Sequence, residues 1–108
     1  MAIAELDGAV IVDEASFHAE SARVFGFPAS YSCTMDAWVD CLSYLRDEDG
    51  MSRFRLQPNE VLKIVVKHSV QLRECVPDVL EEMAFCVIGI NERYDDYGEL
   101  PALELVLA

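Results

Sequence analysis

The sequence predicts an α/β fold in which three parallel strands form one sheet that packs against helices. The first observation is three short runs rich in aliphatic residues, at 2–6, 61–67 and 102–107. The second is that the intervening segments carry helical patterns. Strands joined through helices pair in parallel with right-handed crossovers. The third is the length of 108 residues, which suits a single domain with one hydrophobic core.

The three predicted strands differ in their patterns. Residues 2–6 end at the turn dipeptide Asp7-Gly8, and residues 102–107 place three leucines on one side. Residues 61–67 contain a β-branched run with no strict alternation. This run predicts a central strand that is buried on both faces.

Two helices are predicted from their end signals. Asp13 is an N-cap for a helix over 14–25, and Gly26 with Pro28 stops it. One face of this helix carries the predicted core residues Phe17, Ser21, Val24 and Phe25. His18 lies off that face and is expected at the surface or its boundary. Pro77 begins a further helix over 77–90, and the polar residues 91–97 continue to Gly98, which ends the segment.

Two segments stay open. Residues 68–75 are ambiguous and are compatible with a short helical turn, and residues 10–12 are compatible with a short extended piece. Residues 46–50 are charged and predict a solvated loop.

The central stretch, residues 27–45, predicts a loop that ends in a capped helix. Thr34 is the expected N-cap, because the helical pattern starts immediately after it. One apolar stripe then recurs at helical spacing: Met35, Val39 and Leu42.

Two carboxylates mark a different face of this helix. Asp36 and Asp40 are four residues apart, so their side chains project side by side. Asp36 also stabilises the helix from its first turn, whether or not it binds a partner. Asp40 lies at mid-helix and is either plain solvated surface or a contact residue. Trp38 lies off the apolar stripe, so a place at the edge of the core and a role as an exposed anchor both remain open.

The charge is the strongest compositional feature. The chain has 20 acidic and 8 basic residues, a net charge of −12. Such a surface repels nucleic acid and attracts basic proteins, although solubility alone is the alternative explanation. No apolar run reaches the roughly 18 residues that a membrane span needs. The N-terminal segment has no basic region of a signal peptide, so we expect a cytoplasmic protein with no membrane contact.

Composition and spacing argue against an enzyme or a metal site. The four cysteines, at 33, 41, 75 and 86, have no metal-ligand spacing, so reduced thiols are expected, with at least two buried. No local residue activates a cysteine, and the carboxylate pair lacks a third catalytic group. We therefore expect no catalytic residues, no metal and no cofactor.

The central stretch resembles the signature of the barstar family, intracellular inhibitors of barnase-type ribonucleases. The resemblance is carried by Phe27-Pro28, Tyr31 and residues 34–42. It extends to Phe17 and His18 upstream. It implies the α/β architecture described above and a basic ribonuclease or related toxin as the partner.

The resemblance also implies roles for individual residues. Asp40 matches the aspartate that occupies the phosphate site of the nuclease, and Asp36 matches a second contacting acid. Thr34 stands at the family asparagine and Ser32 at the family glycine. Aromatic contact positions of barstar are changed at Ser30, Val39 and Leu45. The predicted partner-binding residues are Ser30, Tyr31, Ser32, Thr34, Asp36, Val39, Asp40 and Ser43.

The sequence therefore predicts an acidic inhibitor or immunity-type protein, monomeric when free, that blocks a basic ribonuclease with carboxylates. The alternative is a barstar-related interaction or regulatory module that no longer inhibits a nuclease. A self-associating structural protein is a third alternative.

Overall fold

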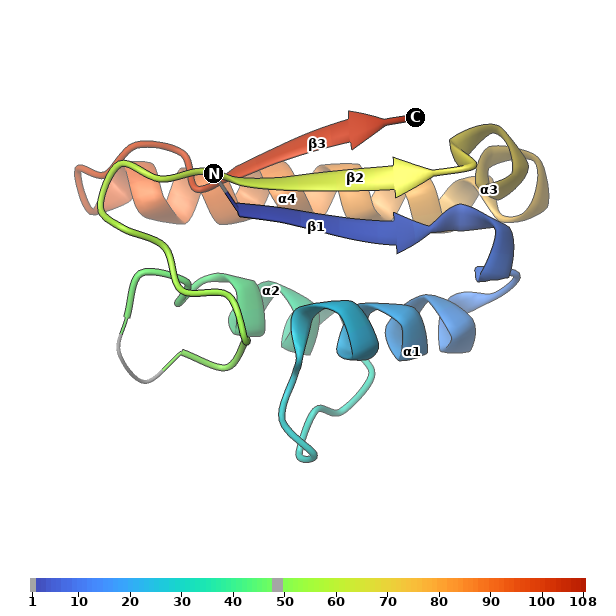
Figure 1. The fold of residues 1–108 in the computed structure, drawn as a ribbon, viewed down its shortest axis with the longest axis horizontal. Helices are drawn as coiled ribbons and strands as arrows, with labels where there is room; N and C mark the ends of the chain where they lie inside the picture. The colour runs from blue at the N-terminus through green and yellow to red at the C-terminus, as the bar shows by residue number, and fades with distance from the viewer. Residues whose placement is uncertain (1, 48–49) are drawn as a thin grey trace.

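A three-stranded sheet forms the centre of the fold (Figure 1). The computed structural model describes residues 2–47 and 50–108, so Glu48 and Asp49 of the predicted charged loop lie outside the described residues. The strands β1 (Ala2–Asp7), β2 (Leu62–Lys67) and β3 (Leu103–Leu107) pair in parallel, in the order β1-β2-β3. The predicted α/β fold with a three-stranded parallel sheet is confirmed.

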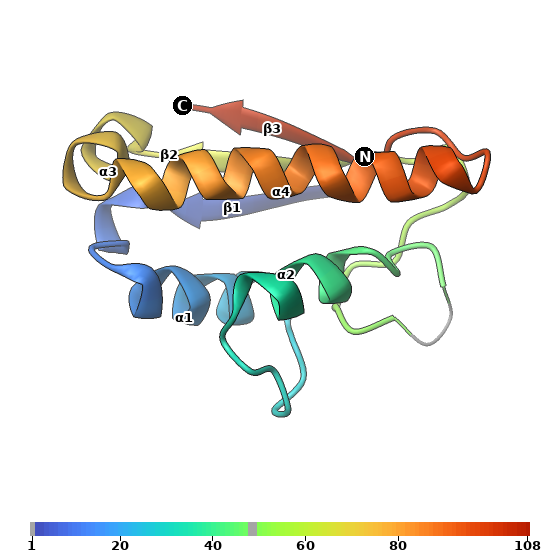
Figure 2. The ribbon, with the colours of Figure 1, turned by 180° about the vertical axis from the view of Figure 1, so that it is seen from behind.

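Helices connect the strands. They are α1 (Glu14–Phe25), α2 (Met35–Leu42), α3 (Ser69–Cys75) and α4 (Pro77–Asp96). Figure 2 shows α4 running along one face of the sheet, with α1 and α2 beside β1. The open segment 68–75 holds α3. Of residues 10–12, Val10 ends a 3-10 helix (Gly8–Val10), and Ile11 has an extended backbone but joins no strand. α4 continues beyond the predicted residue 90.

The predicted N-caps of α1 and α2 and the predicted end of α1 are confirmed. The Asp13 side chain accepts a hydrogen bond from the Ser16 N–H at 2.7 Å, and Ser16 Oγ accepts from the Asp13 N–H, which forms a capping box. Gly26 ends α1 in the left-handed conformation with φ 67°. Thr34 Oγ1 accepts from the Ala37 N–H at 3.2 Å and so caps α2.

The prediction that the central strand is buried on both faces is wrong. Leu62, Ile64 and Val66 are fully buried, whereas Lys63 is half-buried and Lys67 is exposed. Burial thus alternates along β2, so that one face of the strand is covered and the other stays in partial contact with solvent. The consecutive run Ile64-Val65-Val66 concealed the two-residue period of the strand, because Val65 places an aliphatic side chain on the less buried face.

The prediction for His18 is also wrong. The four predicted core residues of α1 are buried, but so is His18. Its Nδ1 forms a hydrogen bond of 2.5 Å with the Tyr31 hydroxyl. The loop after α1 therefore covers a histidine that the helix pattern places at the surface, and Tyr31 supplies a polar partner for one of its two ring nitrogens.

Burial differs among the cysteines, all of which are free. Cys41 is buried, Cys86 is half-buried, and Cys33 and Cys75 are exposed. The prediction of at least two buried thiols is therefore met fully by one cysteine and partly by a second. The exposed pair lies on a loop and at the end of the short helix α3, where no hydrophobic core covers them.

Candidate functional site

Trp38 fixes α2 to the body of the protein. Its ring is fully buried, and its Nε1–H donates to Ser21 Oγ at 3.1 Å. The rings of Phe17 and Phe25 lie 5.9 Å and 6.2 Å from it, centroid to centroid. Of the two roles left open for Trp38, the place in the core is the one observed, and an exposed anchor is excluded.

The buried face of α2 is therefore rotated from the predicted stripe. Trp38, Cys41 and Leu42 are buried, whereas Met35 and Val39 are half-buried and pack against the margin of the core. The sequence pattern identified an apolar stripe one side-chain position away from the buried one. The rotation decides which side chains of α2 meet solvent.

Both carboxylates of α2 face solvent. Asp36 is exposed, and the Asp40 side chain is 57% exposed. The cap at Thr34 holds the start of the helix, and Ser43 Oγ donates to the Val39 carbonyl at 2.6 Å near its end. A short helix fixed at both ends and anchored by an indole presents these two groups with little freedom to move.

Arg93 of α4 reaches the same place. One of its terminal nitrogens donates to Asp40 Oδ1 at 3.3 Å and to Ser43 Oγ at 3.1 Å. The Arg93 side chain is 49% exposed. Ion pairs between such exposed groups contribute only about 0–1 kcal/mol. Asp40 therefore keeps most of its accessibility while it contacts a cation of its own chain.

The loop before α2 borders Asp40. A shallow hollow of about 160 Å³ is lined by Pro28, Ser30, Tyr31, Ser32, Ala37, Asp40, Cys41 and Met51. Within it, burial raises the pKa of the Tyr31 hydroxyl, with Cys33 and Cys41 as smaller causes, and His18 bonds to the same oxygen. The loop and the helix thus form one continuous surface.

A family comparison identifies this arrangement. A family model described as Barstar (barnase inhibitor) matches residues 1–106, nearly the whole chain. The chain belongs to the barstar family. No curated protein matches it. Among the described residues, no helix is long and apolar enough to cross a membrane.

The two departures from the barstar pattern in the loop have different consequences. The left-handed residue of this loop is Cys33, with φ 57°, and not Ser32, which replaces the family glycine. Ser32 is therefore not strained by its side chain. Thr34, in place of the family asparagine, acts as the N-cap, and its Oγ1 lies 3.2 Å from Ser32 Oγ. Both substitutions leave the backbone of the loop and helix intact.

The thiols of Cys41 and Cys86 are poor nucleophiles. Burial, with a smaller contribution from Asp40, raises the pKa of Cys41. Burial raises the pKa of Cys86 as well, followed by the charges of Glu82 and Asp36. Reactive cysteines need a lowered pKa, so these two thiols remain protonated at neutral pH. The geometry fits the barstar family, whose members are inhibitors.

The structure brings together most of the predicted partner-binding residues. Ser30, Tyr31, Ser32 and Asp40 line the loop hollow, and Ser43 meets Asp40 through Arg93. Asp36 lies close enough to Cys86 of α4 for its charge to help raise the pKa of that thiol. Val39 is half-buried and offers only part of its side chain to a partner.

Sequence reasoning missed the contribution of α4, namely Arg93. It reaches Asp40 because α2 packs against α4, a contact between segments about fifty residues apart in the chain. The spacing 82, 86, 89 and 93 follows one helix face and was the available signal. It could not show which helix that face meets.

Proposed function

We propose that this barstar-family protein binds a basic ribonuclease, or a related toxin, and blocks its active site with the carboxylates of Asp36 and Asp40. The observation that carries the proposal is that both carboxylates are exposed on a short helix that is capped by Thr34 and anchored by Trp38. A ribonuclease active site binds RNA phosphates with cationic side chains. Carboxylates held in fixed positions offer the same charge to those cations.

The charge of the whole chain supports the same partner. A net charge of −12 attracts a basic protein and raises the rate of encounter. The Asp40–Arg93 pair does not prevent binding, because an exposed ion pair is weak and a partner arginine can replace Arg93. Ser30, Tyr31, Ser32, Thr34, Val39 and Ser43 would complete the contact around the carboxylates.

Inhibition of a barnase-type ribonuclease across a range of ionic strengths tests the proposal. We expect strong inhibition at low salt that weakens as salt is added, because screening reduces the attraction between exposed charges. Asp40→Asn keeps the shape of the side chain and removes its charge, so it should weaken inhibition more than any other single change on α2.

Asp95→Asn is the matched control. Asp95 is exposed on α4 and its substitution changes the net charge equally. It should alter the salt dependence slightly and leave inhibition at physiological salt intact. Equal inhibition by the wild type and Asp40→Asn at every salt concentration would contradict the proposal that carboxylates block the active site.

One observation favours the alternative of an interaction module without nuclease inhibition. Arg93 offsets part of the charge of Asp40, the residue that would occupy the phosphate site. A pull-down from the source cells separates the two functions. A basic ribonuclease among the bound proteins supports inhibition. Specific binding of another protein, with no ribonuclease bound, supports the alternative.

A further inference from the structure

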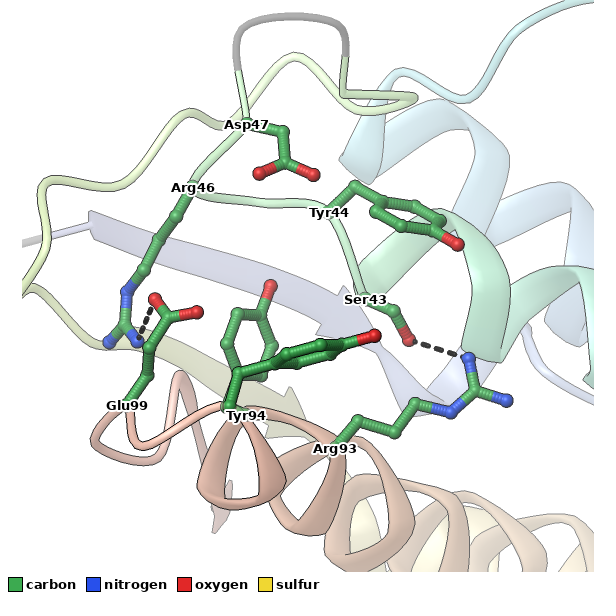
Figure 3. A pocket seen from close by; sticks show the side chains of 8 residues that line it. Ser43, Tyr44, Arg46, Asp47, Arg93, Tyr94 and Glu99 are labelled. Carbon is green, nitrogen blue, oxygen red and sulfur yellow. Dashed lines mark hydrogen bonds and ion pairs between the residues drawn. The ribbon is translucent and has the colours of Figure 1, made fainter.

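A larger hollow lies between the segment that follows α2 and the C-terminal end of α4 (Figure 3). Its volume is about 430 Å³, and it is lined by Ser43, Tyr44, Arg46, Asp47, Arg93, Tyr94, Tyr97 and Glu99. It adjoins the candidate site, because Arg93 on its wall donates to both Ser43 and Asp40. A hollow of this size can receive a large side chain of a protein that covers Asp40.

The two arginines of the hollow already have partners. The Arg46 side chain is only 6% exposed and donates to the carbonyls of Leu100 at 2.8 Å and Glu60 at 3.0 Å. It also pairs with the Glu99 carboxylate at 3.4 Å. Arg93 pairs with Asp40. Each guanidinium is therefore offset by a carboxylate of the same chain, which disfavours an anionic ligand.

The remaining groups favour a cation. Figure 3 shows the Asp47 carboxylate pointing toward the cavity. Over residues 2–47 and 50–108, the carboxylate of Asp47 forms no ion pair. Tyr44 is exposed, Tyr97 is 83% exposed, and Tyr94 forms a buried wall. Exposed aromatic rings beside a carboxylate attract a guanidinium or ammonium group through ring faces and charge together.

We propose that this hollow binds an arginine or lysine side chain of the basic partner, between the rings of Tyr44 and Tyr97 and the carboxylate of Asp47. The inference rests on the proposed function for the identity of the partner, but not for the chemistry of the hollow. The net charge of −12 makes a partner rich in such side chains the favoured one. The two tyrosines would supply the aromatic contact that Ser30, Val39 and Leu45 lack.

The chemistry can be tested on the protein alone, with N-methylguanidinium as the probe. We expect it to shift the NMR resonances of the Tyr44 and Tyr97 rings in a saturable way. The double variant Asp47→Asn/Tyr97→Ala should weaken this binding by roughly tenfold, which corresponds to about 1.4 kcal/mol. The same variant should keep the resonances of the buried Trp38, which reports an intact fold.

The matched control is Glu81→Gln/Phe85→Ala, which removes the same charge and another exposed ring from α4 at a different hollow. It should bind the probe as the wild type does. Equal loss in both double variants would show attraction to the acidic surface in general and would overturn the proposal. Shifts of the Tyr44 and Tyr97 resonances by inorganic phosphate and not by N-methylguanidinium would make the hollow an anion site.

The outcome is separable from that of the proposed function. If Asp47→Asn/Tyr97→Ala binds the ribonuclease as tightly as the wild type while Asp40→Asn does not, the inhibitor function stands and the hollow is not used. If the probe binds but no ribonuclease is inhibited, the hollow serves a different basic partner.

Discussion

Two arginine–carboxylate pairs of this protein differ in what their carboxylates do. Glu20 of α1 is 6% exposed, accepts a bidentate contact from Arg23 at 2.9 Å, and also accepts from the backbone N–H of Asp7 at 2.9 Å. Asp40 of α2 is 57% exposed and receives one contact of 3.3 Å from Arg93. The first carboxylate joins a helix to a strand, whereas the second is held loosely at the surface.

The difference shows that net charge alone does not identify a binding surface. Glu20, Asp7 and Asp13 each accept a backbone N–H and have lowered pKa values, so part of the acidity stabilises the fold. Among the described residues, the side chains of Asp36 and Asp40 accept no backbone N–H, and both are exposed on α2. Carboxylates that the fold does not use are the ones that remain for a partner.

The largest expected effect is on affinity. The double variant Asp36→Ala/Asp40→Ala should weaken binding to a basic ribonuclease by about 2–5 kcal/mol or more for each buried charge pair that is lost. The barnase–barstar complex is itself the standard example of this magnitude. Its stability should change by less than about 1 kcal/mol, because both groups are exposed. Calorimetric titration and urea unfolding measure the two quantities. A large loss of stability would mean that these two carboxylates stabilise the fold, as Glu20 does.

Glu20→Ala should show the opposite separation. It removes the acceptor of the Asp7 N–H, and an unpaired buried donor costs about 1–3 kcal/mol of unfolding free energy. Affinity for the ribonuclease should be unchanged, since Glu20 lies on α1. Urea unfolding measures the loss, with Glu92→Ala on the exposed face of α4 as the control. Unaltered stability would mean that water replaces the Glu20 carboxylate at the Asp7 N–H.

Acid should weaken the fold through the structural carboxylates. The side chain of Arg23, and then the N–H of Asp7, lower the pKa of Glu20 from its ordinary 4.5. A carboxyl whose pKa is lower in the folded state stabilises the fold above its ordinary pKa and ceases to do so as the pH falls through the lowered value. The unfolding free energy should therefore decrease below about pH 4.5. Glu20→Gln should decrease less steeply, and an unchanged slope would contradict this account.

The smallest expected effect concerns Arg93. Arg93→Gln breaks the exposed pair with Asp40, which is worth about 0–1 kcal/mol, so affinity for a basic partner should rise by up to about fivefold. Arg73→Gln, on exposed α3, removes the same charge far from Asp40 and should have a weaker effect. Competition between the variants for one ribonuclease detects such a difference. Weaker binding by Arg93→Gln would mean that Arg93 holds Asp40 in the orientation needed for binding.

Features fixed by neighbouring residues could be predicted from the sequence. The caps at Asp13 and Thr34 and the stop at Gly26 depend on side chains within a few residues, and all three are found as predicted. The parallel sheet follows from the alternation of strands and helices. The spacing of Asp36 and Asp40 predicts that they share one helix face, whereas their exposure depends on how Trp38 seats the helix.

Features fixed by contacts between distant segments could not be predicted. His18 is buried because the loop with Tyr31 covers it, and Trp38 is buried because α1 supplies Phe17 and a hydroxyl partner. Arg93 meets Asp40 only because α4 packs beside α2. In each case the decisive neighbour lies more than ten residues away, where local periodicity carries no information.

The environment of Trp38 gives the protein a built-in optical reporter. It is the single tryptophan of the chain, and its indole is buried beneath the helix that carries Asp36 and Asp40. A partner that docks on the outer face of α2 touches no part of the indole, so docking alone leaves the emission wavelength unchanged. A red shift would signal that α2 has moved off Ser21, and fluorescence can thus separate rigid docking from a rearrangement of the helix.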